Sequence, residues 1–157
     1  MVRYLDKGNE LGLLEELFGL YFENMNAIAP EEAPYEVQKR EWVACIGEAL
    51  TKDPRQILLI YAEGEMAGFC MYYINKGILM IEELQLRREY QRTALLLPLY
   101  RYFRKQREQI ESVECFAHKQ NSHSRKLIGK WGMEPVGQTP DGRIIHFKGP
   151  ADQMFHK

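Results

Sequence analysis

Two adjacent carboxylates, Glu82 and Glu83, are the pair of side chains in this sequence best suited to proton transfer. They interrupt an apolar segment, residues 78–86, that has the alternation of a β-strand. Neighbouring strand residues point to opposite faces, so only one of the two carboxylates can face a given cleft. In a regular strand, until a bulge intervenes, Glu82 lies on the side of Leu84 and Leu86, which favours Glu82 as a general base with Glu83 as the next candidate. Solvated strand carboxylates are the alternative interpretation.

Three histidines are further candidates for acid–base chemistry. His118 directly follows an apolar segment at residues 113–117, where it could transfer protons near neutral pH. A hydrogen-bonded histidine at the rim of a sheet is the competing interpretation. His123 falls in the first turn of a predicted helix and is expected at the surface, whereas His146 lies in a terminal strand and is expected to be structural.

Composition limits the classes of partner. The 157 residues are 45% hydrophobic and carry a net charge of -1, which predicts one domain over residues 1–157 with no nucleic acid or membrane as partner. Neither a signal peptide nor an apolar segment long enough to span a bilayer is visible, which predicts a cytoplasmic protein. Cys45, Cys70 and Cys115 are widely spaced within apolar runs, so we expect reduced core residues and no metal site.

The periodicity of apolar residues predicts the elements that position these groups. Strands are expected at residues 2–5, 56–63, 66–74, 78–86 and 113–117, with two more within 136–147, and helices at 11–22, 35–50, 92–110 and 122–130. The order combines an antiparallel meander with a parallel crossover. The sequence therefore predicts an α+β fold with a central mixed, mostly antiparallel sheet and about four flanking helices.

This order of elements resembles the GNAT superfamily of N-acetyltransferases over nearly the whole chain. Residues 81–96 lie where that family places its cofactor motif, in which a bulged strand leads into a loop of pattern R/Q-x-x-G-x-G/A. Gln91 fills the first position, while Ala94 and Leu96 stand where the family has Gly and Gly or Ala. The resemblance implies that backbone N–H groups at a helix N-terminus cradle the pyrophosphate of coenzyme A. The residues it assigns to the cofactor are Leu84, Leu86, Gln91, Arg92, Thr93, Ala94, Leu95, Leu96 and Asn121.

A second motif supports the same resemblance. Residues 121–133 are similar to the family pattern N-x-x-A-x-x-L-Y-x-K-x-G-F and match it at Asn121, Leu127, Lys130 and Gly132. Ile128 replaces the tyrosine that in the family protonates the departing thiolate. Tyr90, His118, His123 and water are the substitutes that the sequence offers. Arg87, Arg88 and Arg92 form a basic cluster that could pair with the phosphates of coenzyme A.

The resemblance implies direct transfer of an acetyl group from acetyl-CoA to a primary amine of an unknown small-molecule or protein acceptor. Glu82, Glu83 and His118 are then the predicted catalytic residues. A catalytically inactive binding module on the same fold is the alternative, because Leu96 and Ile128 depart from the motifs. Dimerisation through the terminal strands is a further possibility that the sequence leaves open.

Overall fold

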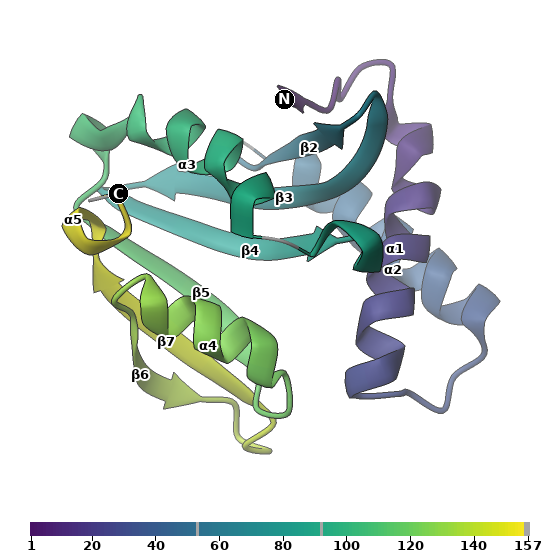
Figure 1. Cartoon of the computed structure of the whole chain (residues 1–157). Coiled ribbons are helices and arrows are strands. Elements are labelled where there is room, and N and C mark those ends of the chain that lie inside the picture. Colours follow the sequence, from purple (N-terminus) through teal and green to yellow (C-terminus); the bar gives the residue numbers. More distant parts are fainter. Residues whose placement is uncertain (53, 92, 156–157) are drawn as a thin grey trace.

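The computed structural model describes residues 1–52, 54–91 and 93–155. In the part of the chain that it describes, seven strands form one sheet in the order β1-β2-β3-β4-β5-β7-β6 (Figure 1). The strands are β1 (Val2–Tyr4), β2 (Gln56–Ala62), β3 (Glu65–Asn75), β4 (Ile78–Leu86), β5 (Ser112–His118), β6 (Glu134–Gln138) and β7 (Ile144–Pro150). Every neighbouring pair is antiparallel except β4 and β5, which are parallel. The predicted mixed, mostly antiparallel sheet is confirmed.

Two-residue turns join the strands of the central meander. Glu63 and Gly64 between β2 and β3 have φ values of 54° and 81°, and Lys76 and Gly77 between β3 and β4 have 51° and 79°. Two successive residues with positive φ are the mark of the tight hairpin turn whose twist matches that of the strands it joins. Glycine adopts that conformation without steric cost, and its place in both turns explains why the chain reverses there.

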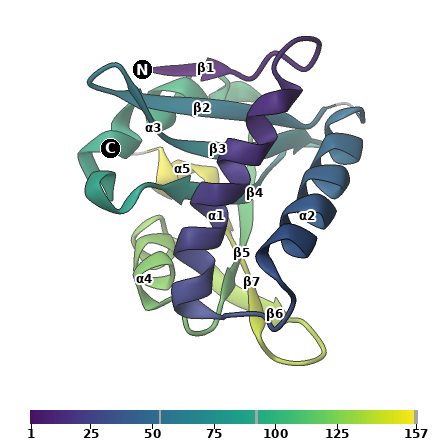
Figure 2. The same cartoon turned by 90° about the vertical axis from the view of Figure 1, so that its right-hand side faces the viewer.

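The helices cover the two faces of the sheet unequally. They are α1 (Leu14–Ile28), α2 (Tyr35–Leu50), α3 (Leu97–Arg104), α4 (Ser122–Lys130) and α5 (Ala151–Met154). Helices α1 and α2 lie over β1–β4 on one face (Figure 2), where Leu17, Phe69 and Met71 belong to one apolar cluster. The other cluster, which includes Leu79 and Phe103, lies beneath α3, α4 and α5.

Two predicted helices have different bounds in the structure. The first begins with a 3₁₀ turn and then continues to Ile28, six residues beyond the predicted end, so that its last turns reach the end of β4. The predicted long helix at 92–110 is wrong, because only Leu97–Arg104 is α-helical, between short 3₁₀ turns. Pro98 lies in the first turn of α3, where its missing N–H costs nothing.

One other expectation about side chains is corrected. Cys70 and Cys115 are buried as predicted, whereas Cys45 is exposed on α2 and is not a core residue.

Within the described ranges, none of the helices has both the length and the apolarity needed to cross a bilayer.

Candidate active site

A cleft opens where β4 and β5 separate. The two strands pair only over Ile78–Ile81 and Ser112–Cys115, and beyond these residues they diverge (Figure 1). The cleft has a volume of about 580 Å³, and it is lined by residues of α1, of the C-terminal halves of both strands, of the loop that follows β4 and of the whole length of α4. A cavity therefore lies between the separated ends of these two strands.

A β-bulge at Glu82 changes which way the two carboxylates point. Met71 pairs with Glu83 and Tyr72 pairs with Ile81, so Glu82 is the extra residue. The expectation that Glu82 lies on the side of Leu84 and Leu86 is wrong. Those leucines pack into the cluster beneath α3, which includes Tyr72.

Glu82 lies on the opposite face, beside Arg55. Tyr73 follows the core residue Tyr72 in β3, so its side chain lies on the face of the sheet opposite to Tyr72. The Arg55 guanidinium lies 5.4 Å from the centre of the Tyr73 ring. Arg55 Nη1 is 3.0 Å from Glu82 Oε2. Burial raises the pKa of Glu82 and the guanidinium opposes that shift, while Oε1 is buried and has no hydrogen-bond partner among the residues that the structure describes. The ion pair with Arg55 makes Glu82 the less suitable of the two carboxylates for removing a proton.

Glu83 is the carboxylate with the pKa of a general base. Burial raises its pKa to about 7, and the negative charge of Glu82 adds to this shift, while a hydrogen bond from Gln85 opposes it. Gln85 Nε2 donates that bond to Glu83 Oε1 over 2.6 Å. At a pKa near 7 the carboxylate can accept a proton and release it again around neutral pH.

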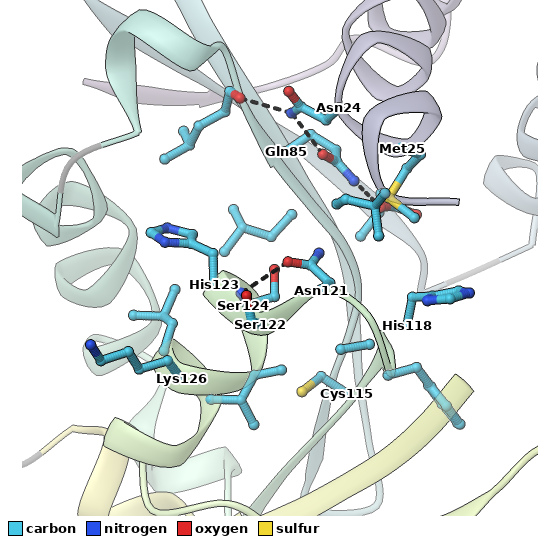
Figure 3. A pocket seen from close by; sticks show the side chains of 18 of the residues that line it. Asn24, Met25, Gln85, Cys115, His118, Asn121, Ser122, His123, Ser124 and Lys126 are labelled. Carbon is cyan, nitrogen blue, oxygen red and sulfur yellow. Dashed lines mark hydrogen bonds between the residues drawn. The ribbon is translucent and has the colours of Figure 1, made fainter. Parts of the chain in front are cut away.

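Gln85 is itself held by the first helix. Asn24, near the end of α1, donates from Nδ2 to Gln85 Oε1 and to the Leu86 carbonyl, each over 2.9 Å (Figure 3). Asn24 and Gln85 are both buried. The sequence analysis missed both residues, because an isolated Asn in an amphipathic helix or Gln in a strand gives no sign of burial.

Only some of the residues predicted to bind the cofactor in the loop after β4 line the cleft. Gln91 and Leu96 line the cleft, as do Leu84 and Leu86 of β4. Ala94 is exposed and Leu95 is half-buried, and neither lines the cleft. Thr93 begins a 3₁₀ turn that ends at Leu96, while Arg92 lies outside the described residues. The predicted α-helical N-terminus at this loop is thus a 3₁₀ turn leading into α3.

The opposite wall is the start of α4. Asn121 caps this helix, accepting a hydrogen bond at Oδ1 from the Ser124 N–H over 3.1 Å. His123, expected only at the surface, is exposed and also lines the cleft, near Asn121 and Ser124 (Figure 3). Ile128 is buried and lines the same wall, where its apolar side chain can donate no proton.

His118 also lines the cleft, at the end of β5. Its Nδ1 accepts a hydrogen bond from the Gln120 N–H over 3.1 Å, so a neutral ring carries its proton on Nε2. Tyr90 is not among the residues that line the cleft. His146 is also outside it and has the expected structural role, 2.7 Å from Glu114 and stacked on Phe116.

Positive charge reaches the cleft from both walls. Arg88 lines it from the loop, and Lys126 and Lys130, one helical turn apart, line it from α4. Arg87 is engaged elsewhere, since it contacts Glu16 and the Met66 carbonyl. Lys126 was missed by the sequence analysis, although its i,i+4 spacing from Lys130 could have identified it. Within the described residues, His, Cys, Asp and Glu side chains form no group of three or more suited to a metal ion.

Solved structures with the same architecture are acetyltransferases. No protein-family model matches the sequence, and no match is found among curated proteins. The PaiA N-acetyltransferase from Thermoplasma acidophilum, in complex with coenzyme A, superposes with a TM-score of 0.73 at 19% identity, over 96% of this chain and 98% of the other. An acetyltransferase from Thermus thermophilus gives a TM-score of 0.73 at 15% identity, over 96% and 97% of the two chains. An aminoglycoside acetyltransferase in complex with coenzyme A gives 0.68 at 14% identity, over 100% and 98%.

At such low identity the likeness establishes the fold. The chain has the fold of the GNAT acetyltransferases, as the order of its predicted elements indicated. Which reaction the cleft performs depends on its own residues.

Proposed function

We propose that this protein is an N-acetyltransferase that transfers the acetyl group of acetyl-CoA directly to a primary amine. The observation that carries the proposal is Glu83, a carboxylate with a pKa of about 7 on the wall of the cleft between β4 and β5. Two of the structurally similar acetyltransferases were solved with coenzyme A.

The cleft suits a long anionic thioester. Arg88, Lys126 and Lys130 supply positive charge for its phosphates. The main chain at Leu84 and Leu86, beside the bulge, is where we expect N–H groups to polarise the acyl carbonyl. Acetyl-CoA would supply the activated acyl group, and the residues of the chain would hold and orient it.

Glu83 is the proposed general base, in place of Glu82. An alkylammonium acceptor must lose a proton before its nitrogen can attack a carbonyl carbon, and the Glu83 carboxylate takes that proton. The neutral amine then forms the C–N bond and the C–S bond breaks. The attacking nitrogen loses a second proton, to water, as the amide forms, and the thiolate receives a proton. His118, His123 and water are the available donors, because Ile128 has none.

A binding module without catalytic activity is the second candidate. It is favoured by Leu96 and Ile128, two buried apolar side chains on the cleft wall at positions where the family motifs have a small residue and a tyrosine. On this proposal the cleft binds a ligand but transfers no acyl group.

The first experiment is isothermal titration of the protein with acetyl-CoA and with coenzyme A. Micromolar binding supports the proposed cofactor, and no heat at millimolar ligand would reject both the cofactor and the transferase. Thiol release is then measured with a panel of primary amines. Binding with no release by any amine would favour the binding module, and release that survives Glu83→Gln would remove Glu83 as the base. Glu108→Gln, an exposed carboxylate in the turn that follows α3, is the matched control.

A further inference from the structure

Asn24 is a buried polar side chain on an otherwise apolar helix face. It is 8% exposed, while the other buried residues of α1 are leucine and phenylalanine. A buried amide is costly unless its hydrogen bonds are made, and Asn24 makes three. Its Nδ2 donates to Gln85 Oε1 and to the Leu86 carbonyl, and its Oδ1 accepts from Gln91 Nε2 over 3.4 Å.

The donors and acceptors in the series from Glu83 through Gln85 to Asn24 are fixed, starting from Glu83. The ionised Glu83 carboxylate is only an acceptor, so the Gln85 amide must point its N–H toward it and its oxygen away. That oxygen needs a donor, and Asn24 Nδ2 provides one. With its second proton bound to the Leu86 carbonyl, the Asn24 amide cannot turn without losing contacts at both ends.

We propose that Asn24 is the positioning residue of this site: through Gln85 it keeps an N–H group directed at Glu83, and it joins that carboxylate to Gln91 at the opening of the cofactor loop. We call the hydrogen bonds from Asn24 to Gln85 and from Gln85 to Glu83 the relay. Its role in catalysis rests on the proposed function, whereas the direction of its hydrogen bonds can be tested without any substrate.

The surroundings of Glu83 determine what loss of the relay would do. The titratable groups that interact electrostatically with it are Glu82 of β4, which pairs with Arg55, Tyr21 of α1 and, from the other face of the sheet, Cys70 of β3. Burial and Glu82 raise its pKa, and the hydrogen bond from the Gln85 N–H lowers it. Substituting Asn24 by leucine removes no charge, so a change in the titration of Glu83 would come from the relay.

The test is a pH titration of the Glu83 carboxyl carbon by ¹³C NMR in the full chain, with Glu83→Gln used to assign the signal. Gln85→Leu removes the N–H donor, and we expect it to move the Glu83 midpoint upward by about half a pH unit or more. Asn24→Leu should move it in the same direction, because the Gln85 amide is then free to turn. The double variant should show the shift of Gln85→Leu alone, since Asn24 acts through Gln85.

A matched control lies on the same helix. Asn26 is exposed two residues after Asn24, so Asn26→Leu should leave the midpoint unchanged. An unchanged midpoint in Asn24→Leu, or additive shifts in the double variant, would overturn the proposal. Either result is independent of whether acetyl transfer is found, so failure of the relay and failure of the proposed function are distinguishable.

A second measurement on the unmodified protein covers the case in which Asn24→Leu does not fold. The side-chain amide protons of Gln85 and Asn24 should shift with pH at the midpoint of Glu83, while those of Asn26 should not. Asn24 amide protons that do not respond to the ionisation of Glu83 would refute the relay.

Discussion

The two walls of the cleft are built in different ways. On the β4 wall, Glu83, Gln85 and Asn24 hold one another through directed hydrogen bonds, and α1 packs over them. On the α4 wall, Ile128 is buried and apolar, and Lys126 and His123 are side chains at the rim. On the proposed function the β4 wall removes the proton of the acceptor amine, whereas the α4 wall, among the residues that the structure describes, supplies positive charge from Lys126 and Lys130. We expect substitutions on the β4 wall to affect the rate most and those on the α4 wall to affect cofactor binding.

Glu83→Gln should have the largest effect. An amide of the same shape cannot accept the proton of the acceptor amine, so we expect the turnover rate to fall by about 10²- to 10⁴-fold, with little change in affinity for acetyl-CoA. Thiol-release kinetics and calorimetry would measure the two quantities. A variant that retains most of its turnover would mean that the two walls do not differ in the way described.

The same substitution, which lowers the turnover rate, should increase the free energy of unfolding above pH 7. The pKa of Glu83 is about 7 in the folded chain, above its ordinary value of 4.5, so the folded state binds this proton more tightly than the unfolded state. Its contribution to stability is full below pH 4.5 and is lost as the pH rises through 7. Well above pH 7, Glu83→Gln should be more stable than the parent protein by up to about 3 kcal/mol, and below pH 4.5 the difference should vanish. Denaturant titrations at about pH 5 and pH 8 would show it, and a difference that does not depend on pH would contradict the raised pKa.

Charge reversal on the α4 wall should weaken cofactor binding with a smaller effect on the chemical step. Lys126→Glu should raise the dissociation constant of coenzyme A by about 10-fold at low salt, and by less at high salt, because salt screens exposed charges. Lys105→Glu, an exposed lysine at the end of α3, is the matched control and should bind normally. If both variants bind coenzyme A with equal affinity, Lys126 does not contact the phosphates.

The smallest effects are expected at the histidines. His118→Ala and His123→Ala should each lower turnover by about 10-fold or less, because water can also protonate the thiolate. Comparison of the two single variants with the double variant would assign proton delivery. A fall in the double variant as large as that of Glu83→Gln would show that one of these two histidines, His118 of β5 or His123 of α4, is a specific donor.

The sequence predicted the fold well because the periodicity of the apolar residues reflects burial directly. The meander, the parallel strand after it and the helix at residues 122–130 all follow from patterns that extend over many residues. The candidate site was predicted less well, because it depends on single residues that interrupt those patterns. An unbroken alternation places Glu82 beside Leu84, and the bulge at Glu82 reverses that inference. The resemblance indicated a bulged strand in this region, but no glycine marks the bulge, and the pairing with β3 is what assigns it to Glu82.

The wrong bound predicted for the first helix has a similar cause, since it also depends on single residues. The end of α1 was expected six residues too early because the apolar spacing fades there, yet these last turns contain Asn24, which bonds to β4. Tertiary contacts stabilise the extra turns, and they leave no local mark in the sequence.

The parallel contact between β4 and β5 has a consequence for how the chain folds. The meander strands are joined by two-residue turns and can pair early, whereas the contact of Ile78 with Ser112 must close the long segment between them. The cleft lies directly beyond that contact. We therefore expect its two walls to come together late in folding. A chain that has formed only the meander would already contain Glu83 and Gln85 but would lack the cavity that they line.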